Sequence, residues 1–288
     1  MDEVARSRIA LARHYVDIDR PERALATLSD ATGAELADPE FWVCQASALY
    51  DLNRFDEGVD AALRGLELDP DDLRLVDLLG LNHLGARRLA PAKQAIDRAL
   101  ELAPDDPIVV CHHALVLAKL GRFEEAEAEV SRALALAPHA SHVLRVRAQV
   151  ASLAGDHARA SVYADEVLAV DPEDRVAHIL KGNAAVGRAR YSDAVRHFEE
   201  AARLEPTDDI VEAVRDNRVA GHPLLKPLRP IYRFGRWRAW FVYLALFLVF
   251  RIVFPPLAVA IAVVWISLAV LSWTAPSLLR RRERRRRI

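Results

Sequence analysis

Apolar residues recur along residues 39–208 at the three- and four-residue spacing of amphipathic helices, and the whole pattern repeats every 34 residues. Proline closes each repeat, because it cannot continue a helix and disfavours helix at the residue before it. The five closing prolines are Pro70, Pro104, Pro138, Pro172 and Pro206. Each block therefore reads as two amphipathic helices joined by a turn, which predicts an all-α chain.

Small residues recur at fixed places within the blocks and would let paired helices approach closely. One set lies in the middle of the first helix: Ala46, Gly80, Ala114, Ala148 and Gly182. A second set opens the second helix: Gly58, Ala92, Ala126, Ala160 and Ala194.

This 34-residue helix–turn–helix block resembles the tetratricopeptide repeat. The resemblance covers residues 39–208 as five regular repeats, and extends more weakly to a degenerate N-terminal repeat within residues 1–38. There Leu36 replaces the closing proline, and we expect Gly33 to end the second helix early. A capping helix is expected over residues 209–221, ending at Gly221. The resemblance implies a right-handed solenoid of helical hairpins.

Polar residues occupy one position of the repeat at which the family often has a leucine that faces the partner helix. They are Gln45, His113, Arg147 and Lys181, and only Leu79 keeps the leucine. We expect either looser packing in those repeats or polar groups that reach past the core.

Charge divides the chain sharply. Residues 222–288 carry 13 Lys or Arg and one acidic residue, whereas the rest of the chain is strongly acidic, so the overall net charge is only −2. Such a split indicates an acidic array followed by a basic segment that faces a membrane or a nucleic acid. Base-reading or aromatic groups are not interleaved with the arginines of the 274–288 tail, so we expect lipid contact and no nucleic-acid partner.

An apolar stretch, residues 239–273, follows a proline- and arginine-containing linker at 222–238. Pro255 and Pro256 divide it into arms 239–254 and 257–273, which predicts a two-helix transmembrane hairpin. Arg251 costs about 3 kcal/mol on the insertion scale, and the apolar residues of the first arm outweigh that cost. A single span with a helix lying in the interface is the alternative.

Arginines flank both ends of the apolar stretch, so the positive-inside rule places both ends on the cytoplasmic side. The predicted membrane-interface residues are Tyr232, Arg236, Trp237, Arg238, Trp240, Arg251 and Trp273. The first residues lack the apolar run of a signal peptide. We therefore expect the array and both termini in the cytoplasm, tethered to a bacterial inner membrane.

No catalytic or cofactor-binding motif is present, and we expect neither an enzyme nor a cofactor. His112 and His113 point in different directions on a helix, and His139 and His142 lack an evident third ligand, so no metal site is expected. Cys44 and Cys111 lie two repeats apart, too far for a disulfide, and are expected to be reduced thiols.

In the family, first-helix residues line a groove that holds an extended peptide or a helix. The corresponding candidates here are Val43, Ser47, Tyr50, Asp77, Leu81, Leu84, Cys111, Leu115, Arg145, Gln149, Ile179 and Asn183. Their mainly apolar character suits an amphipathic helix or an apolar peptide. The family's carboxylate clamp is missing, since only Arg74 keeps the right charge. The opposing interpretation is that neighbouring helices or the chain's own linker fill this face.

These features predict a non-enzymatic, membrane-tethered scaffold or adaptor that binds a protein partner. The alternative is an assembly or regulatory subunit of an integral membrane complex, which packs through its hairpin.

Overall fold

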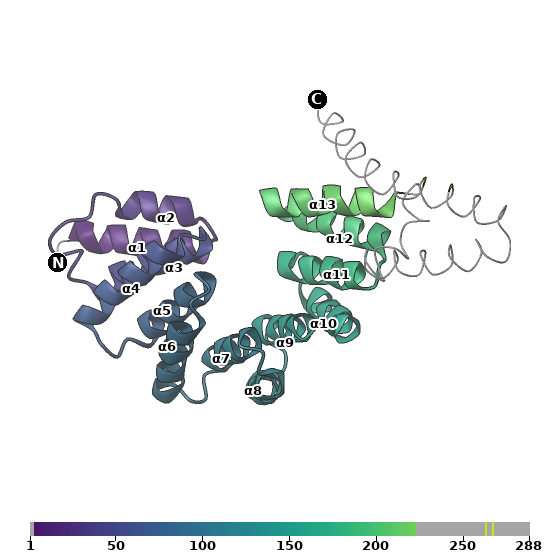
Figure 1. Ribbon diagram of the computed structural model, residues 1–288. Coiled ribbons are helices and arrows are strands. Elements are labelled where there is room, and N and C mark those ends of the chain that lie inside the picture. The colour runs from purple at the N-terminus through teal and green to yellow at the C-terminus, as the bar shows by residue number, and fades with distance from the viewer. Residues whose placement is uncertain (1–2, 223–262, 264–266, 268–288) are drawn as a thin grey trace, which may run out of the picture. The chain divides into compact units, whose positions relative to one another are not determined.

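The computed structural model describes residues 3–222 together with residues 263 and 267. Within residues 3–222 the chain forms thirteen α-helices and no strand (Figure 1). Contacts divide the chain into two compact units, Met1–Pro172 and Glu173–Ile288. The predicted all-α fold of successive helix pairs is confirmed for the described residues.

Ten of these helices belong to the first unit. They pair as α1 (Glu3–Asp17) with α2 (Pro21–Leu28), α3 (Pro39–Asp51) with α4 (Phe55–Leu68), α5 (Leu73–Gly85) with α6 (Leu89–Leu102), α7 (Pro107–Lys119) with α8 (Phe123–Leu136), and α9 (Ser141–Leu153) with α10 (His157–Val170). The described part of the second unit holds α11 (Arg175–Gly187), α12 (Tyr191–Leu204) and α13 (Asp208–Gly221).

Aspartates start most of the first helices. Asp38, Asp72, Asp106 and Asp174 each accept a hydrogen bond from backbone N–H groups in the first turn. Such a cap satisfies donors that the helix itself leaves without a partner. Together with the closing prolines, these caps fix the starts of α3, α5, α7 and α11 in the 34-residue phase, whereas α9 follows Ala140 and has no side-chain cap.

Small residues lie where the helices of a pair come closest, as predicted. A Cβ atom added at Gly80 on α5 would lie 2.4 Å from Ile96 Cδ1 on α6. Ala92, which opens α6, is fully buried. Close approach of the two helices therefore depends on these positions.

The core of the first unit is divided into several clusters along the array. One cluster joins α1–α5 around Trp42 and Leu75, and another joins α7–α9 around Val110 and Val143. In the second unit, Ile210 and Val214 of α13 pack with Phe198 of α12. The helix predicted at 209–221 is thus present and covers the last helix pair.

The first helix pair is irregular. Its second helix ends at Leu28, five residues before Gly33, which has a positive φ of +49°. The indole Nε1 of Trp42 donates a hydrogen bond to the Leu36 carbonyl at 2.9 Å. This bond ties the irregular segment to the first regular repeat.

Candidate protein-binding surface

In the first unit, the first helices of successive pairs contact one another: α1 packs on α3, α3 on α5, α5 on α7, and α7 on α9. Figure 1 shows α5 and α7 following one another, with α6 and α8 on the opposite side. We call the surface formed by α1, α3, α5, α7 and α9 the first-helix face. Because it draws on five helix pairs, it is long enough to contact an extended peptide or a helix.

Most candidate groove residues of the first unit are partly exposed on this face. These are Val43, Ser47, Tyr50, Asp77, Leu84, Leu115, Arg145 and Gln149. Two others offer a partner no surface: Leu81 is 9 % exposed and Cys111 only 1 %. Cys111 belongs to the core that α7 shares with α8 and α9, since α9 packs over it. In the second unit, Ile179 is partly buried and Asn183 is exposed, both on α11.

Polar side chains from four successive helix pairs lie along the first-helix face. The Nδ1 atom of His112 on α7 lies 2.8 Å from Oδ1 of Asp77 on α5. Desolvation, with smaller contributions from the Asp51 and Asp77 carboxylates, raises the pKa of Tyr50 on α3. Desolvation and then the charges of His112 and Arg145 lower the pKa of His142 on α9. A polar row thus runs across α3, α5, α7 and α9.

Two members of this row, His112 and His142, were not placed in the groove from the sequence. The signal for His112 is a spacing of 35 residues from Asp77, one more than the repeat. An acidic residue and a histidine at that spacing fall on facing positions of neighbouring first helices.

A second charged group lies at the N-terminal end of the face. Glu40 accepts from Arg74 at 2.6 Å and pairs with Arg13 at 3.2 Å, while Arg74 also pairs with Asp72 at 3.0 Å. Arg74, which alone kept the charge expected of a carboxylate clamp, is therefore already held by two carboxylates of the chain. A ligand carboxylate would have to displace them.

Neither a metal centre nor reactive thiols emerge from the described residues. Within them, no group of three His, Cys, Asp or Glu side chains is arranged to hold a metal ion. Both cysteines, Cys44 and Cys111, are free and buried. Desolvation by burial raises the pKa of each thiol to about 12, so neither ionises near neutral pH.

Two of the polar residues at the position where the family often has leucine, His113 and Arg147, reach past the core toward the second helices. His113 lies 3.4 Å from Asp97 of α6 and 3.5 Å from Glu129 of α8. Arg147 pairs with Glu166 of α10 at 2.9 Å. For His113 and Arg147, the expectation that polar groups reach past the core is confirmed.

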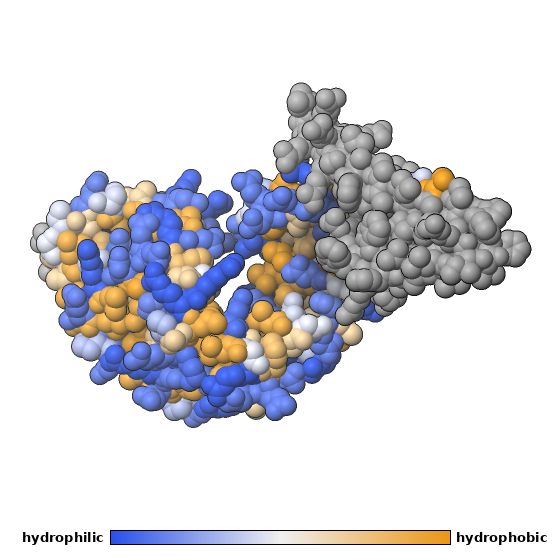
Figure 2. Space-filling model, in the orientation of Figure 1, coloured by the Kyte–Doolittle hydropathy of each residue, from blue (hydrophilic) through white to orange (hydrophobic). Residues whose placement is uncertain are grey.

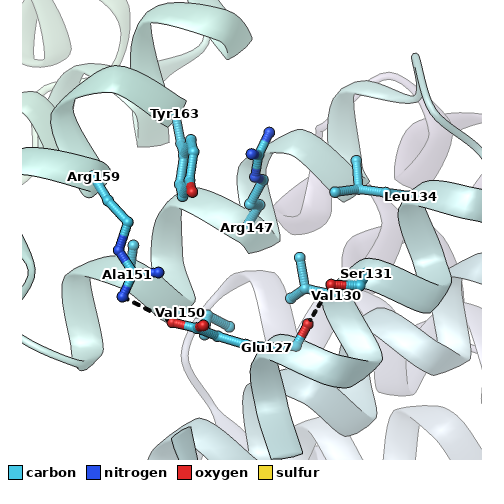
Figure 3. Close-up of a pocket in the computed structure, with 9 residues that line it drawn as sticks. All are labelled: Glu127, Val130, Ser131, Leu134, Arg147, Val150, Ala151, Arg159 and Tyr163. Carbon is cyan, nitrogen blue, oxygen red and sulfur yellow. Dashed lines mark hydrogen bonds and ion pairs between the residues drawn. The ribbon is translucent and has the colours of Figure 1, made fainter. Parts of the chain in front are cut away.

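Beside Arg147, a cavity of about 130 Å³ opens between α8 and α10, with α9 as its floor (Figure 3). The guanidinium carbon of Arg147 lies 3.7 Å from the centroid of the Tyr163 ring. Arg159 pairs with Glu127 across the rim at 3.0 Å. This cavity lies between two second helices and above the first helix α9, and it was not predicted from the sequence.

The predicted linker beyond His222, the hairpin and the basic tail lie outside the described residues, apart from Val263 and Ser267 of the second arm. So do all the predicted interface residues: Tyr232, Arg236, Trp237, Arg238, Trp240, Arg251 and Trp273. Among the described helices, none is long and apolar enough to cross a membrane.

Solved structures with the same fold are distant in sequence. A tetratricopeptide repeat protein from Parabacteroides merdae superposes with a TM-score of 0.65 at 17% identity, over 74% of this chain and 84% of that one. A thermophilic TPR protein from Thermus thermophilus superposes with a TM-score of 0.59 at 17% identity, over 63% of this chain and 100% of that one. PilW, described as a widely conserved type IV pilus biogenesis factor, superposes with a TM-score of 0.56 at 21% identity, over 74% of this chain and 99% of that one.

Among curated proteins, none matches the chain. A family model described as tetratricopeptide repeat matches residues 9–72, 78–141 and 111–175, together more than half of the sequence. The helix pairs, their 34-residue phase and the small residues at their contacts agree with that match. The chain therefore belongs to the tetratricopeptide-repeat family.

Proposed function

We propose that this protein is a non-enzymatic scaffold that binds a protein partner through its first-helix face and is tethered to a membrane by residues 239–273. The observation that carries the binding role is the first-helix face itself. There, partly exposed apolar groups such as Leu84 and Leu115 alternate with the Asp77–His112 pair. Apolar contact area with a few fixed polar groups is what an amphipathic helix or an apolar peptide requires.

Hydropathy supports this mixed character. Figure 2 shows hydrophobic and hydrophilic residues interleaved over the visible face of the first unit. One solved structure of the same fold, Cut9–Hcn1 of the APC/C, is a hetero-tetramer, with a TM-score of 0.60 at 14% identity. Assembly with another protein is thus one use of this fold, and we extend it to the present chain.

The tether is proposed from the sequence. Arginines on both sides of the apolar stretch favour entry and exit on the cytoplasmic side, and the arginines of the 274–288 tail would contact anionic lipid. The array would then face the cytoplasm at a bacterial inner membrane. A partner that is itself at the membrane would meet the array at a raised local concentration.

A second candidate role is that of a subunit of an integral membrane complex. Arg251 favours it, because an arginine within an apolar segment is costly unless it reaches the interface or pairs with an acidic group of another helix. In that case the arms, and not only the array, would contact the partner.

Cell fractionation with two variants tests these proposals. We expect the full chain in the membrane fraction and a chain ending at Gly221 in the soluble fraction. A full chain found soluble would contradict the tether. Replacing residues 223–288 with an unrelated membrane anchor should preserve function in a scaffold and abolish it in a subunit that packs through its own hairpin.

A further inference from the structure

The cavity between α8 and α10 lies on the side of the array opposite the first-helix face. Its floor is apolar and comes from α9, where Val150 is 2 % exposed. Val130 and Leu134 of α8 form one wall, and Tyr163 of α10 forms the other (Figure 3). The volume of about 130 Å³ is similar to the ~150 Å³ of an engineered cavity that holds benzene, but this hollow is open on one side and has polar groups at its rim.

Charges around the cavity are matched in pairs. Arg147 pairs with Glu166 at 2.9 Å, and Arg159 pairs with Glu127 at 3.0 Å and with Asp156 at 2.7 Å. A charged ligand would therefore have to break an existing pair to gain a new one. A neutral group that needs only a flat surface and an apolar floor fits better.

Arg147 supplies the flat surface. One face of its guanidinium lies on the Tyr163 ring, 3.7 Å from the centroid. In Figure 3 the side chain of Arg147 lies between those of Tyr163 and Leu134, so its other face is turned toward the opposite wall. An aromatic ring placed there would stack on the guanidinium, as rings do in cation–π contacts.

Ser131 adds a polar contact at the rim. Its hydroxyl donates to the Glu127 carbonyl at 2.8 Å, which leaves the oxygen lone pairs to accept a further hydrogen bond. A phenol hydroxyl could donate to it. We propose that this cavity binds a tyrosine side chain of a protein partner, as a second contact point beside the first-helix face. The source of the ring rests on the proposed scaffold role, whereas the preference of the cavity for an aromatic ring over a saturated one does not.

Neighbouring repeats do not reproduce this arrangement. One repeat earlier, the residues equivalent to Arg147 and Tyr163 are His113 and Glu129, whose Nδ1 and Oε1 atoms lie 3.5 Å apart. Two repeats earlier they are Leu79 and Ala95. The stacked arginine and ring are thus particular to the fifth repeat within the first unit.

Disulfide tethering on the full-length chain tests the proposal. A Ser131→Cys substitution places a thiol at the rim, while the native cysteines are buried and poorly ionised. The variant is equilibrated with the disulfides of 4-(mercaptomethyl)phenol and of cyclohexylmethanethiol, with increasing 2-mercaptoethanol. Intact-mass spectrometry then measures how much of each label is retained. Ser192→Cys on α12, also exposed but not lining this cavity, is the matched control.

At position 131 we expect the phenol label to be retained about three- to tenfold more strongly than the cyclohexyl label, as a partly exposed cation–π contact provides. At position 192 the two labels should be retained equally. Adding Arg147→Lys keeps the charge but removes the flat surface, and should bring the ratio at 131 close to that of the control. Equal retention of both labels at 131, or an unchanged ratio with Arg147→Lys, would overturn the proposal. Failure of the scaffold role would leave these ratios as they are.

Discussion

The side chain of Asn82 on α5 occupies the space beside Gly58 on α4, where an added Cβ atom would lie 2.0 Å from Asn82 Oδ1. Asn82 is fully buried, and its Nδ2 donates to the Leu78 carbonyl at 2.9 Å and to the Ala46 carbonyl at 3.4 Å. The asparagine thus links the second and third repeats through a space that only glycine leaves open.

Gly58→Ala should therefore destabilise the array, in spite of the higher helix propensity of alanine. We expect a loss of about 1–3 kcal/mol, the usual cost of overpacking a close helix contact. Urea unfolding followed by circular dichroism measures it.

A second substitution provides the control. The equivalent pair one repeat later is Ala92 and Val116, both fully buried. Gly58→Ala combined with Asn82→Val recreates that pair, so the double variant should recover most of the stability that the single variant loses. If the two losses simply add, the contact between these residues is not the cause.

Backbone conformation at the turns gives a second prediction. A residue with positive φ follows the first helix of every pair, at intervals of 34 residues: Asp19, Asn53, Arg87, Gly121, Gly155 and Ala189. The left-handed region is unfavourable for residues other than glycine, alanine included. Ala189→Gly should accordingly raise the free energy of unfolding by about 0.5–1 kcal/mol, and Gly121→Ala should lower it by a similar amount. The two substitutions should change the free energy of unfolding in opposite directions. If both lower it, the turn conformation does not govern stability at these positions.

Asp51 should make stability depend on pH near 6. Desolvation, and next the Asp19 carboxylate, raises the pKa of Asp51 to about 6. A raised carboxylate pKa means that the folded state binds the proton more tightly than the unfolded state, so stability falls as pH rises through 6. Asp51→Asn should then stabilise the protein at pH 7.5 and have less effect at pH 4.5. Asp51 as a whole is exposed although its carboxyl group is partly desolvated, so solvent screening limits the expected gain to no more than about 1 kcal/mol.

Thermal melts of the wild type and Asp51→Asn at the two pH values measure this difference. Asp19→Asn is the control, because it removes one cause of the raised pKa and should reduce the benefit of the Asp51 substitution. An equal benefit of Asp51→Asn at both pH values would rule out titration of Asp51 as the source.

The repeat phase was readable from the sequence because it rests on local chemistry. Pro70 and its equivalents end helices, and Gly80 marks a helix contact, wherever they occur in the fold. The aspartate caps at Asp38 and Asp72 and the left-handed residue after each first helix have the same 34-residue period. They could have been found from spacing alone, since both are also local features.

The exposure of groove positions depends instead on how successive first helices pack. Leu81 and Cys111 occupy equivalent or neighbouring positions to exposed candidates, yet helix packing buries them. Likewise, Arg147 could be recognised as a departure from the repeat pattern, but its stack on Tyr163 depends on the relative placement of α9 and α10. The stack of Arg147 on Tyr163 has no signature in residue spacing, unlike the 35-residue spacing of Asp77 and His112.

Site-specific photocrosslinking in intact cells tests the central claim that the first-helix face binds a protein partner. A photoreactive residue replaces Leu115 on α7 or Tyr50 on α3, and in the matched control it replaces Leu63, which is 46 % exposed on α4. We predict that positions 115 and 50 capture the same membrane-associated protein, that position 63 does not, and that Gln149→Glu with Leu84→Glu abolishes the capture. Equal capture at position 63, or different proteins at 115 and 50, would contradict the account.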